Sequence, residues 1–396
     1  MIYLDNAATT PMDPEVIETV HESMRNDFAN SGTVYSLGLD AKKKIEEAEE
    51  QIRASLSIPQ NYKIIFTSGG SEANNLFIKG YCFHDRKAAC LGLEHPSVTQ
   101  TLDSLSELGP APVALHEFQK EGRLDLSAIP SLKEKKVRLL CLSHVNNELG
   151  SVNDPAVLLT ALAEQSPQTR LFMDGVQAMG KLKLSPAMWQ GLAGYSISGH
   201  KINGPKGIGL LIFEGKLGLK PQVHGGQQQH RLRAGTLPVP LIVGLAQSVK
   251  LAAERVDATV LNNQKLFQHL VTGLKSLVEQ TPGLDVHFNS SLSENLSHQC
   301  PSIVNFRFPP VEGEIMLHHL EEKEIYVGMG SACSAHSKEP SKILTGIGLT
   351  PEEARCSLRI SFGRQNTIAD IDSFLEAFGA AYRQLHSTFN PRTANK

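Results

Sequence analysis

Short apolar runs alternate with stretches of helical periodicity through most of the N-terminal part of the chain. The runs are KIIFT, ACLGL, VRLLCLSHV, RLFMD, YSISG and GIGLLIF. Buried strands that alternate with helices are typical of parallel sheets, because a parallel connection needs a crossover that is usually helical. The pattern therefore predicts an α/β domain with a mostly parallel sheet.

Helix signals flank this region on both sides. Asp13, followed by Pro14 and an acidic first turn, predicts a helix that ends at about Phe28. A second polar helix is predicted from about 39 to 56. A long helix is predicted from about 239 to 280, with a break near Asp257, and would link the first domain to a second.

The C-terminal part mixes short strands with helices. The strands are SIVNFRF and SLRIS, and the helices are EGEIMLHHL and IADIDSFLEAFGAAYRQL. This mixture predicts a smaller α+β domain. We place the large domain at 13–256 and the small domain at 1–12 together with 257–396.

The bulk composition is that of an ordinary globular protein. The chain has 396 residues, of which 41% are hydrophobic and 20% charged, so it can bury the cores of two domains. A formal net charge of -3 gives no general attraction to nucleic acid or to an anionic membrane. The N-terminus lacks a signal-peptide pattern and no stretch approaches the ~20 apolar residues of a membrane span, which predicts a cytoplasmic protein. Six single cysteines without a CxxC pair predict neither disulfides nor a metal site.

Three segments at predicted strand ends carry candidate chemistry. Lys201 in SGHK follows an apolar strand, where α/β proteins place their sites, although a surface lysine in a loop gives the same letters. Ser71 in TSGGSEANN stands at a helix start that suits a phosphate, or simply caps a tight turn. Asp174 in FMDGVQ is either a helix cap or a partner for a pyridine nitrogen. Together they offer one partner each for an aldehyde, a phosphate and a pyridine ring.

Eight segments occur in an order and spacing that resemble a known family. They are YLDNAATTP, FTSGGSEANN, LEHPSV, HVNNELGSV, MDGVQAMG, SGHKINGPKGIG, RAGTLPVP and GSACSA. From Tyr3 to about Gly363 the chain resembles the cysteine desulfurases, which are class V, fold-type I enzymes that use pyridoxal 5′-phosphate (PLP). The resemblance implies a large domain with a mostly parallel seven-stranded sheet. It also implies a smaller α+β domain that carries a catalytic cysteine loop.

The resemblance also implies a role for each site residue. Lys201 would form the Schiff base, Asp174 would pair with the pyridine nitrogen, and Gln177 would donate to the phenolic oxygen. His95 would stack on the ring and move protons. The remaining cofactor contacts would come from Gly70, Ser71, Asn147, Ser198 and His200, and from Thr236 of the neighbouring subunit in a homodimer.

The substrate implied by the resemblance is L-cysteine, whose carboxylate would be held by Asn30, Asn147 and Arg359. Of these, Arg359 has the clearest physical case, because a guanidinium in the apolar strand SLRIS requires a partner. That partner would be either the substrate carboxylate or a structural acid.

Cys333 is the candidate sulfur acceptor. It lies in GMGSACSAHS, a stretch poor in apolar residues, whereas Cys82, Cys90 and Cys141 lie in hydrophobic runs that fit core packing. Cys356, at the start of a strand, fits a structural role. The resemblance implies that Cys333 takes the sulfur as a persulfide and leaves L-alanine, with His336, nearby in sequence, as a further candidate proton carrier.

The spacing from Cys333 to Arg359 resembles the long-loop branch of the family. In that branch the cysteine passes sulfur directly to an acceptor protein, such as an iron–sulfur scaffold or a sulfur carrier. We therefore expect a sulfur-accepting partner.

Two departures from the family pattern keep other functions open. Tyr35 stands where a histidine is usual, and the loop from Gln227 to His230 lacks the usual Glu-Arg pair. One alternative is a selenocysteine lyase or another class V lyase or aminotransferase, which the cofactor residues do not distinguish. Another is a non-catalytic relative that acts as a binding scaffold.

Overall fold

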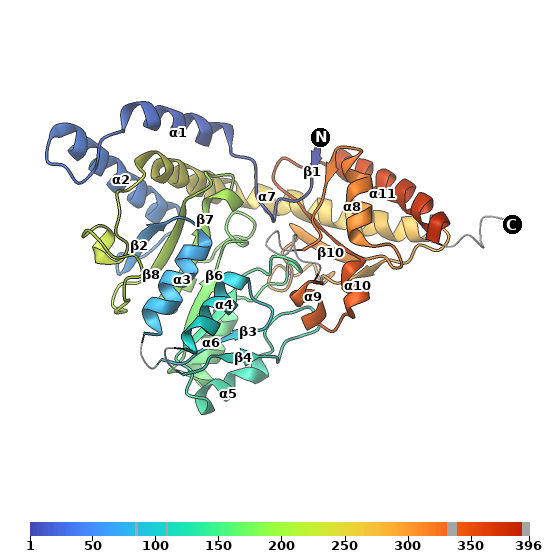
Figure 1. The fold of residues 1–396 in the computed structure, drawn as a ribbon, viewed down its shortest axis with the longest axis horizontal. Helices are drawn as coiled ribbons and strands as arrows, with labels where there is room; N and C mark the ends of the chain where they lie inside the picture. Colours follow the sequence, from blue (N-terminus) through green and yellow to red (C-terminus); the bar gives the residue numbers. More distant parts are fainter. Residues whose placement is uncertain (84–85, 108–109, 331–338, 390–396) are drawn as a thin grey trace.

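The computed structural model describes residues 1–83, 86–107, 110–330 and 339–389 (Figure 1). A seven-stranded sheet forms the centre of its N-terminal part, with the strand order β2-β8-β7-β6-β5-β3-β4. Strand β8 is antiparallel to β2 and β7, and the other neighbours are parallel. The strands are β2 (Tyr62–Thr67), β3 (Ala88–Leu91), β4 (Val113–Leu115), β5 (Leu139–Ser143), β6 (Arg170–Asp174), β7 (Leu192–Ser198) and β8 (Gly209–Glu214). The predicted α/β fold with a mostly parallel seven-stranded sheet is confirmed.

Helices cover both faces of this sheet because both faces are apolar. Ile64 and Phe66 of β2 join the core beneath α2, α6 and α7, whereas Ile65 between them packs with α3 and α4. The helices of this part are α1 (Pro14–Asn26), α2 (Ser36–Ser55), α3 (Gly70–Tyr81), α4 (Pro96–Leu105), α5 (Ile129–Glu134) and α6 (Pro155–Gln165). Four 3₁₀ turns accompany them: η1 (Leu126–Ala128), η2 (Pro186–Gln190), η3 (Gly199–Lys201) and η4 (Gln229–Arg231). Asp13 caps α1 as predicted, and its carboxylate accepts a hydrogen bond from the backbone N–H of Glu15.

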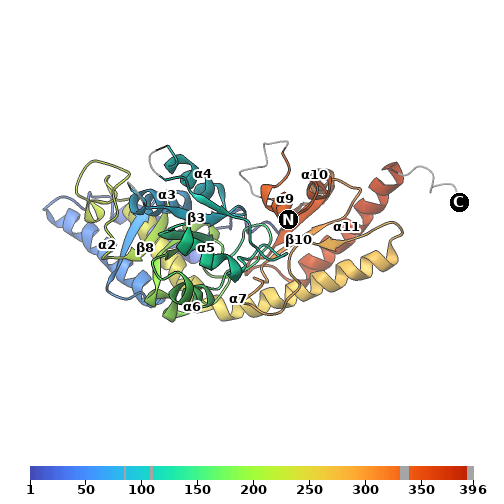
Figure 2. The same ribbon diagram turned by 90° about the horizontal axis from the view of Figure 1, so that it is seen from below.

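A single long helix, α7 (Val239–Gln280), joins the two parts of the molecule (Figure 2). Its first half packs in the core of the large sheet and its second half in a separate core. The predicted break near Asp257 is wrong. The Asp257 carboxylate lies in solvent and pairs with Lys183 at 2.9 Å, so the buried face of the helix, from Val256 to Val260, continues past it.

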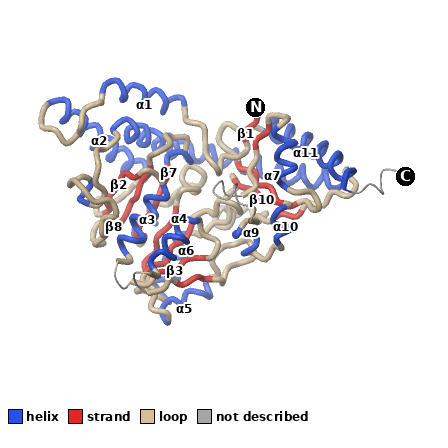
Figure 3. Tube along the Cα trace, in the orientation of Figure 1, coloured by secondary structure: helices blue, strands red, loops and turns tan. Residues whose placement is uncertain are grey.

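The second core lies between α7 and a smaller set of strands and helices, which Figure 3 distinguishes by colour. One sheet is antiparallel with the order β12-β10-β9, and the N-terminal β1 forms a parallel pair with β11. The strands are β1 (Ile2–Tyr3), β9 (His287–Phe288), β10 (Ile303–Arg307), β11 (Ile325–Tyr326) and β12 (Ser357–Ser361). The helices are α8 (Gly313–Glu321), α9 (Lys342–Gly346), α10 (Pro351–Arg355) and α11 (Ile368–Phe389). The predicted α+β character of this part is confirmed, and the exact domain boundaries stay a prediction.

Within the described ranges, none of the helices has the length and apolar character needed to cross a bilayer.

Candidate active site

The candidate residues gather at one edge of the large sheet because the parallel strands end there together. Ser143, the last residue of β5, pairs with Asp174 at the end of β6, and Asp174 pairs with Ser196 near the end of β7. Lys201 is the third residue after the end of β7, on the turn η3. This edge is where open α/β sheets place their ligands.

Lys201 and Gln177 converge on the N-terminal segment. The Lys201 amine donates to the backbone carbonyl oxygens of Ala7 at 2.5 Å and Ala8 at 2.6 Å. The Gln177 amide nitrogen donates to the same Ala7 oxygen at 2.8 Å. The segment YLDNAATTP therefore holds the lysine and the glutamine at a common point.

Asp174 is buried and accepts two hydrogen bonds. Its Oδ1 accepts from the backbone N–H of Val176 at 3.0 Å, and its Oδ2 accepts from the Asn74 amide at 2.8 Å. The first bond closes a turn after β6, where no helix begins, so Asp174 is not the helix cap of the alternative interpretation. Because a carboxylate oxygen can accept more than one bond, both oxygens retain acceptor capacity for a protonated ring nitrogen.

Asn74 links Asp174 to His95, and the sequence interpretation missed it. Its amide nitrogen also donates to the Ser97 hydroxyl at 2.8 Å, and that hydroxyl lies 2.8 Å from the His95 Nδ1. The Ser97 backbone N–H donates to the same ring nitrogen, which places the proton of a neutral His95 on Nε2. The signal was present in SEANN: Asn74 lies four residues after Gly70, on the same face of α3.

The electrostatics around His95 favour its neutral form. Burial is the main cause that lowers the pKa of His95, the nearby Asp174 carboxylate opposes it, and the Lys201 cation adds to the lowering. A neutral imidazole is able to accept a proton at physiological pH.

The start of α3 forms a cradle beside the end of β7. Gly69 caps the helix without a side-chain bond, so the first backbone N–H groups lack a cap from that residue. At Gly70 a Cβ atom would come within 2.6 Å of the Val176 side chain, which explains the glycine. Ser198 is buried, and its hydroxyl lies 3.7 Å from the Cβ position of Gly69. A helix start with an adjacent hydroxyl fits a phosphate group.

His200 lies beside this cradle in its neutral form. Its Nδ1 is 3.1 Å from the Thr9 hydroxyl, and burial with the Lys201 and Lys206 cations lowers the pKa of His200 to about 4. Ser71, the next residue of α3, is exposed.

Arg359 is 1% exposed and already has one acidic partner. Its Nη2 pairs with Asp5 at 2.6 Å and its Nη1 donates to the backbone oxygen of Asn147 at 2.8 Å. The Nε atom has no hydrogen-bond partner within the described part of the chain. The structure therefore shows the structural ion pair. Because a guanidinium has five N–H donors, the Nε proton and further Nη protons remain for another acceptor.

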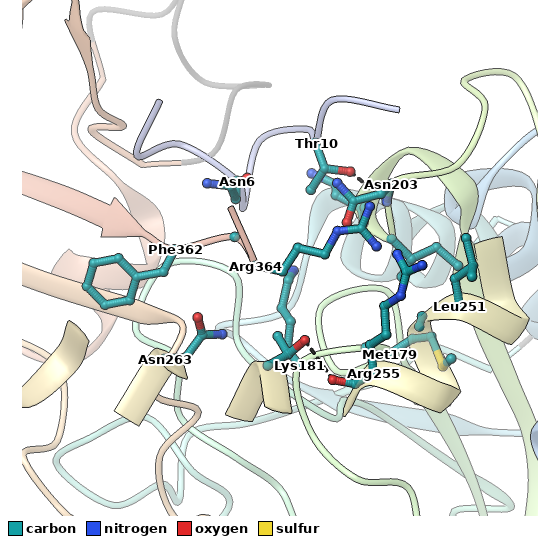
Figure 4. Close-up of a pocket in the computed structure, with 16 residues that line it drawn as sticks. Asn6, Thr10, Met179, Lys181, Asn203, Leu251, Arg255, Asn263, Phe362 and Arg364 are labelled. Carbon is teal, nitrogen blue, oxygen red and sulfur yellow. Dashed lines mark hydrogen bonds between the residues drawn. The ribbon is translucent and has the colours of Figure 1, made fainter. Parts of the chain in front are cut away.

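Two cavities border these residues. The larger, of about 1010 Å³, is lined by His95, Ser71 and Asn147. The smaller, of about 40 Å³, lies where the large sheet, α7 and the segment after β12 meet, and Lys201 and Lys181 line it (Figure 4).

Four predicted site residues lie apart from this group or outside the described residues. Asn30 is exposed between α1 and α2, where its side chain accepts from the Gly32 N–H at 2.9 Å. Thr236 is exposed on the segment before α7. Cys333 and His336 lie outside the described residues.

The described residues on either side of the Cys333 segment approach Glu148, the neighbour of Asn147. The Ser341 hydroxyl donates to the Glu148 carboxylate at 2.5 Å, and the Cβ position of Gly330 is 3.4 Å from the same carboxylate. Both ends of the segment therefore meet at the wall of the larger cavity.

Comparison with known proteins identifies the family. The family model described as aminotransferase class-V matches residues 2–374. The chain belongs to this family. Cysteine desulfurases named IscS match nearly its whole length. The one from Dictyoglomus turgidum is 31% identical over 390 residues, covering 98% of this chain and 95% of the relative. The one from Escherichia coli O139:H28 is 35% identical over 386 residues, covering 95% and 91%.

Two solved structures share the fold. A protein titled as NifS-like superposes with a TM-score of 0.85 and is 26% identical, covering 96% of this chain and 98% of that one. A structure titled as SspA in complex with cysteine has a TM-score of 0.75 and is 28% identical, covering 93% and 100%. The resemblance to PLP-dependent cysteine desulfurases is confirmed, and PLP is the cofactor of this family.

Proposed function

We propose that this chain converts L-cysteine to L-alanine and passes the sulfur, as a persulfide on Cys333, to an acceptor. The convergence of Lys201, Asp174 and the start of α3 at one edge of the sheet carries this proposal. These groups offer separate partners for an aldehyde, a ring nitrogen and a phosphate, which are the three functional ends of PLP. The relatives that match nearly the full length are named cysteine desulfurases, which supports the same reaction.

The residues of the edge would divide the work of holding the cofactor. Lys201 would bind it covalently through Nζ, Asp174 would keep its ring nitrogen protonated, and Gln177 would donate to its phenolic oxygen. Gly70, Ser71, Ser198 and His200 would surround the phosphate. Bound PLP withdraws electrons from the bonds at the substrate Cα, which makes that proton removable.

His95 and Lys201 would move the protons. The hydrogen bonds from Ser97 fix the neutral ring of His95 with its proton on Nε2. Stacked on the cofactor, that ring would release its proton from Nε2 as Nδ1 takes one up from the Ser97 side. The amine of Lys201, when free, is the base for the Cα proton.

Arg359 would hold the substrate carboxylate with Asn147. Asn30, which lies apart from them between α1 and α2, stays a predicted contact. The Nε of Arg359 and the second protons of its Nη atoms are not used by the contacts with Asp5 and Asn147, so the carboxylate would share the guanidinium with Asp5. Burial of this guanidinium strengthens the interaction with an anion.

Cys333 would take the sulfur directly. Its thiolate would form an S–S bond with the substrate sulfur while the substrate C–S bond breaks. The electron pair of the broken bond would stay with the substrate carbon, which takes up a proton on the way to alanine, and a persulfide would remain on Cys333. The approach of both flanking ends to Glu148, at the wall of the cavity, supports this role. An iron–sulfur scaffold or a sulfur-carrier protein would then accept the sulfur.

A homodimer with shared sites would complete the phosphate contacts through Thr236. The surface of α1 and α2 supports such an interface, because large apolar side chains are exposed there, with Phe28 at 74% and Val34 at 90%. Others in this region are Ile17, Met24, Tyr35, Leu37 and Leu39. The cytoplasmic location expected from the sequence stays a prediction.

The scaffold alternative rested on the altered loop from 224 to 236. That loop is held in place: Gln229 bonds to the backbone of Phe66, and Arg233 pairs with Glu72 of α3 at 2.9 Å. The altered Gln229 therefore holds the loop against β2, and the unaltered Arg233 holds it against α3, whose start forms the phosphate cradle. This arrangement favours an intact site over a non-catalytic relative.

A single assay tests the proposed reaction. The protein, purified with PLP, is given L-cysteine and a thiol reductant, and alanine and sulfide are measured. Cys333→Ser should abolish both products while the visible absorption of the bound cofactor persists, and Lys201→Ala should abolish that absorption. Cys356→Ser is the matched control and should leave turnover unchanged. Full turnover in Cys333→Ser would refute the persulfide role, and parallel kinetics on selenocysteine separate the lyase alternative.

A further inference from the structure

Lys181 is a buried lysine whose side-chain amine, within the described ranges, makes its one hydrogen bond to a proposed cofactor contact. It is 6% exposed, and it lies four residues after Gln177 in the turn that follows β6. Its Nζ donates to the Gln177 Oε1 at 2.5 Å. A buried cation is costly, so a lysine at this position requires a physical explanation.

The Gln177 amide is held at both ends. Its oxygen accepts from Lys181, and its nitrogen donates one proton to the Ala7 carbonyl at 2.8 Å. An amide nitrogen has two protons, so one remains for another acceptor. Flipping the amide would set its nitrogen against the Lys181 cation and its oxygen against the Ala7 oxygen. Only one orientation is therefore stable.

Among the residues that the structure describes, no carboxylate pairs with the charge of Lys181. On the walls of the smaller cavity, the other charged side chains are all cationic: Lys201, Arg255 and Arg364 (Figure 4). Cys300 and Arg359 are the other titratable groups that act on it. Burial, the largest cause, lowers the pKa of Lys181 to about 8, so it remains mostly charged at pH 7.

We propose that Lys181 is a positioning residue that acts through Gln177, fixing the amide so that its free N–H faces the phenolic oxygen of the cofactor and strengthening that donor with its charge. This inference rests on the proposed role of Gln177. A cation bonded to the amide oxygen draws electrons from the amide and makes its N–H a stronger donor. The same charge favours the form of the cofactor that carries more negative charge on its phenolic oxygen.

The pH dependence of the bound cofactor tests this directly. The visible band of the holoenzyme, in the absence of substrate, changes as the cofactor–lysine linkage loses its proton, and its midpoint pH can be titrated. Removing a positive charge nearby favours the protonated form. Lys181→Met should therefore raise the midpoint by about one pH unit. Lys181→Gln, which keeps a donor without the charge, should also raise it, and it provides a second variant if the first does not fold.

Three controls separate a positioning role from a structural one. Lys183→Met removes an exposed lysine two residues away and should leave the midpoint unchanged. Lys181→Arg keeps the charge and should retain a midpoint near that of the wild type. In a Gln177→Leu background, Lys181→Met should add much less than it does alone, because its route to the cofactor is gone.

The outcomes distinguish this inference from the proposed function. A wild-type protein that binds no PLP at Lys201 would contradict the placement of the cofactor itself. A normal visible band whose midpoint is the same in the wild type, Lys181→Met and Lys181→Gln would overturn the role of Lys181 alone. An equal shift with and without Gln177 would show that the charge acts independently of the amide, and would also overturn the inference.

Discussion

Glu94, the residue before His95, is a buried carboxyl with an unusual proton affinity. Burial is the main cause that raises its pKa to about 8, opposed by hydrogen bonding from Ser143 and aided by the Asp174 charge. Its Oε2 accepts from the Ser143 backbone N–H at 2.7 Å. At pH 7 the native protein therefore keeps this carboxyl largely protonated, next to a histidine that is neutral.

The raised pKa of Glu94 predicts a pH-dependent stability. The unfolded chain releases this proton at about pH 4.5 and the native protein at about pH 8, so the native state binds more protons between these values. Stability should therefore fall as pH rises across this window. Glu94→Gln keeps an acceptor for Ser143 and should remove this loss, which raises the free energy of unfolding at pH 8 by about 1–3 kcal/mol.

Urea unfolding of the two proteins at pH 5 and pH 8 measures the effect. The difference between them should be largest at pH 8. Glu22→Gln, on the exposed surface of α1, is the matched control and should follow the wild type at both values. A Glu94→Gln protein with the same pH slope as the wild type would contradict the assignment.

The residues that would contact the cofactor could be predicted from the sequence, but the hydrogen bonds and ion pairs that hold them in place could not. Lys201 and Asp174 could be predicted because each follows or ends an apolar strand, where α/β proteins place their sites, and because few residue types can bind an aldehyde or a ring nitrogen. Asn74 and Lys181 act through a second residue, and the sequence shows only a helix position for one and a lysine in a turn for the other. Arg359 shows the limit most clearly, since the strand pattern required a buried partner but did not reveal that Asp5, from the N-terminus, is one.

At the scale of elements, the loop from 224 to 236 protects an exposed edge of the large sheet. Strand β2 is the last strand on its side, and its free edge would otherwise present backbone groups to other chains. The Gln229 side chain accepts from the Phe66 N–H at 2.6 Å and donates to the Phe66 carbonyl at 2.9 Å. One amide thus occupies the edge as a neighbouring strand would.

Gln229→Leu should remove both bonds and weaken this edge. We expect the free energy of unfolding to fall by about 1–3 kcal/mol, because two partly buried backbone groups lose their partners. Aggregation during heating should increase as the edge opens. Thermal unfolding with light scattering measures both, and Gln227→Leu, an exposed glutamine in the same loop, should change neither.

The same loop contains a strained arginine. Arg231 has a φ of 65°, a left-handed conformation that suits glycine, and its side chain makes an exposed contact with Gln227. Arg231→Gly should therefore stabilise the protein by about 0.5–1 kcal/mol. Arg231→Ala pays the same conformational cost and should not stabilise it. Denaturant unfolding measures the free energy of unfolding of both variants. Equal values would show that the backbone at residue 231 is not strained.

Elements with strong local signals were predicted well, and those that depend on packing were not. Asp13 and Pro14 fix the start of α1 locally. The break expected near Asp257 did not form, because an aspartate on the solvent face costs a helix only a few tenths of a kcal/mol and α7 is buried along its other face. Helix propensity alone does not reveal which side of a residue faces water.

At the scale of the whole molecule, Asp13 joins three distant segments. Its Oδ1 caps α1, while its Oδ2 pairs with Arg255 of α7 at 3.0 Å and also with Arg364 after β12. The residue is nearly buried, so these pairs are less screened than surface pairs. A single carboxylate thus connects α1, the long helix α7 and the segment that follows β12.

If the sites of a homodimer are shared, two variants that are each defective should restore activity when they are combined in one dimer. If Thr236 reaches the phosphate of its neighbour, each site combines Lys201 of one subunit with Thr236 of the other. Lys201→Ala should be inactive alone, and Thr236→Ala should bind PLP weakly alone. Mixing them under conditions that exchange subunits forms hybrids in which one site carries both defects and the other carries neither.

The hybrid should therefore regain turnover at up to about half of its sites, since the intact site is wild type in both residues. Purifying the hybrid through two different affinity tags and measuring alanine formation at limiting PLP gives the readout. Mixing Lys201→Ala with Asp174→Ala is the control, because both residues belong to one subunit's part of the site and each hybrid site then keeps one defect. No recovery in the Thr236 hybrid would place Thr236 in its own subunit's site. Recovery in the control would show that Lys201 and Asp174 of one site come from different subunits, which would contradict the assumed division of the site.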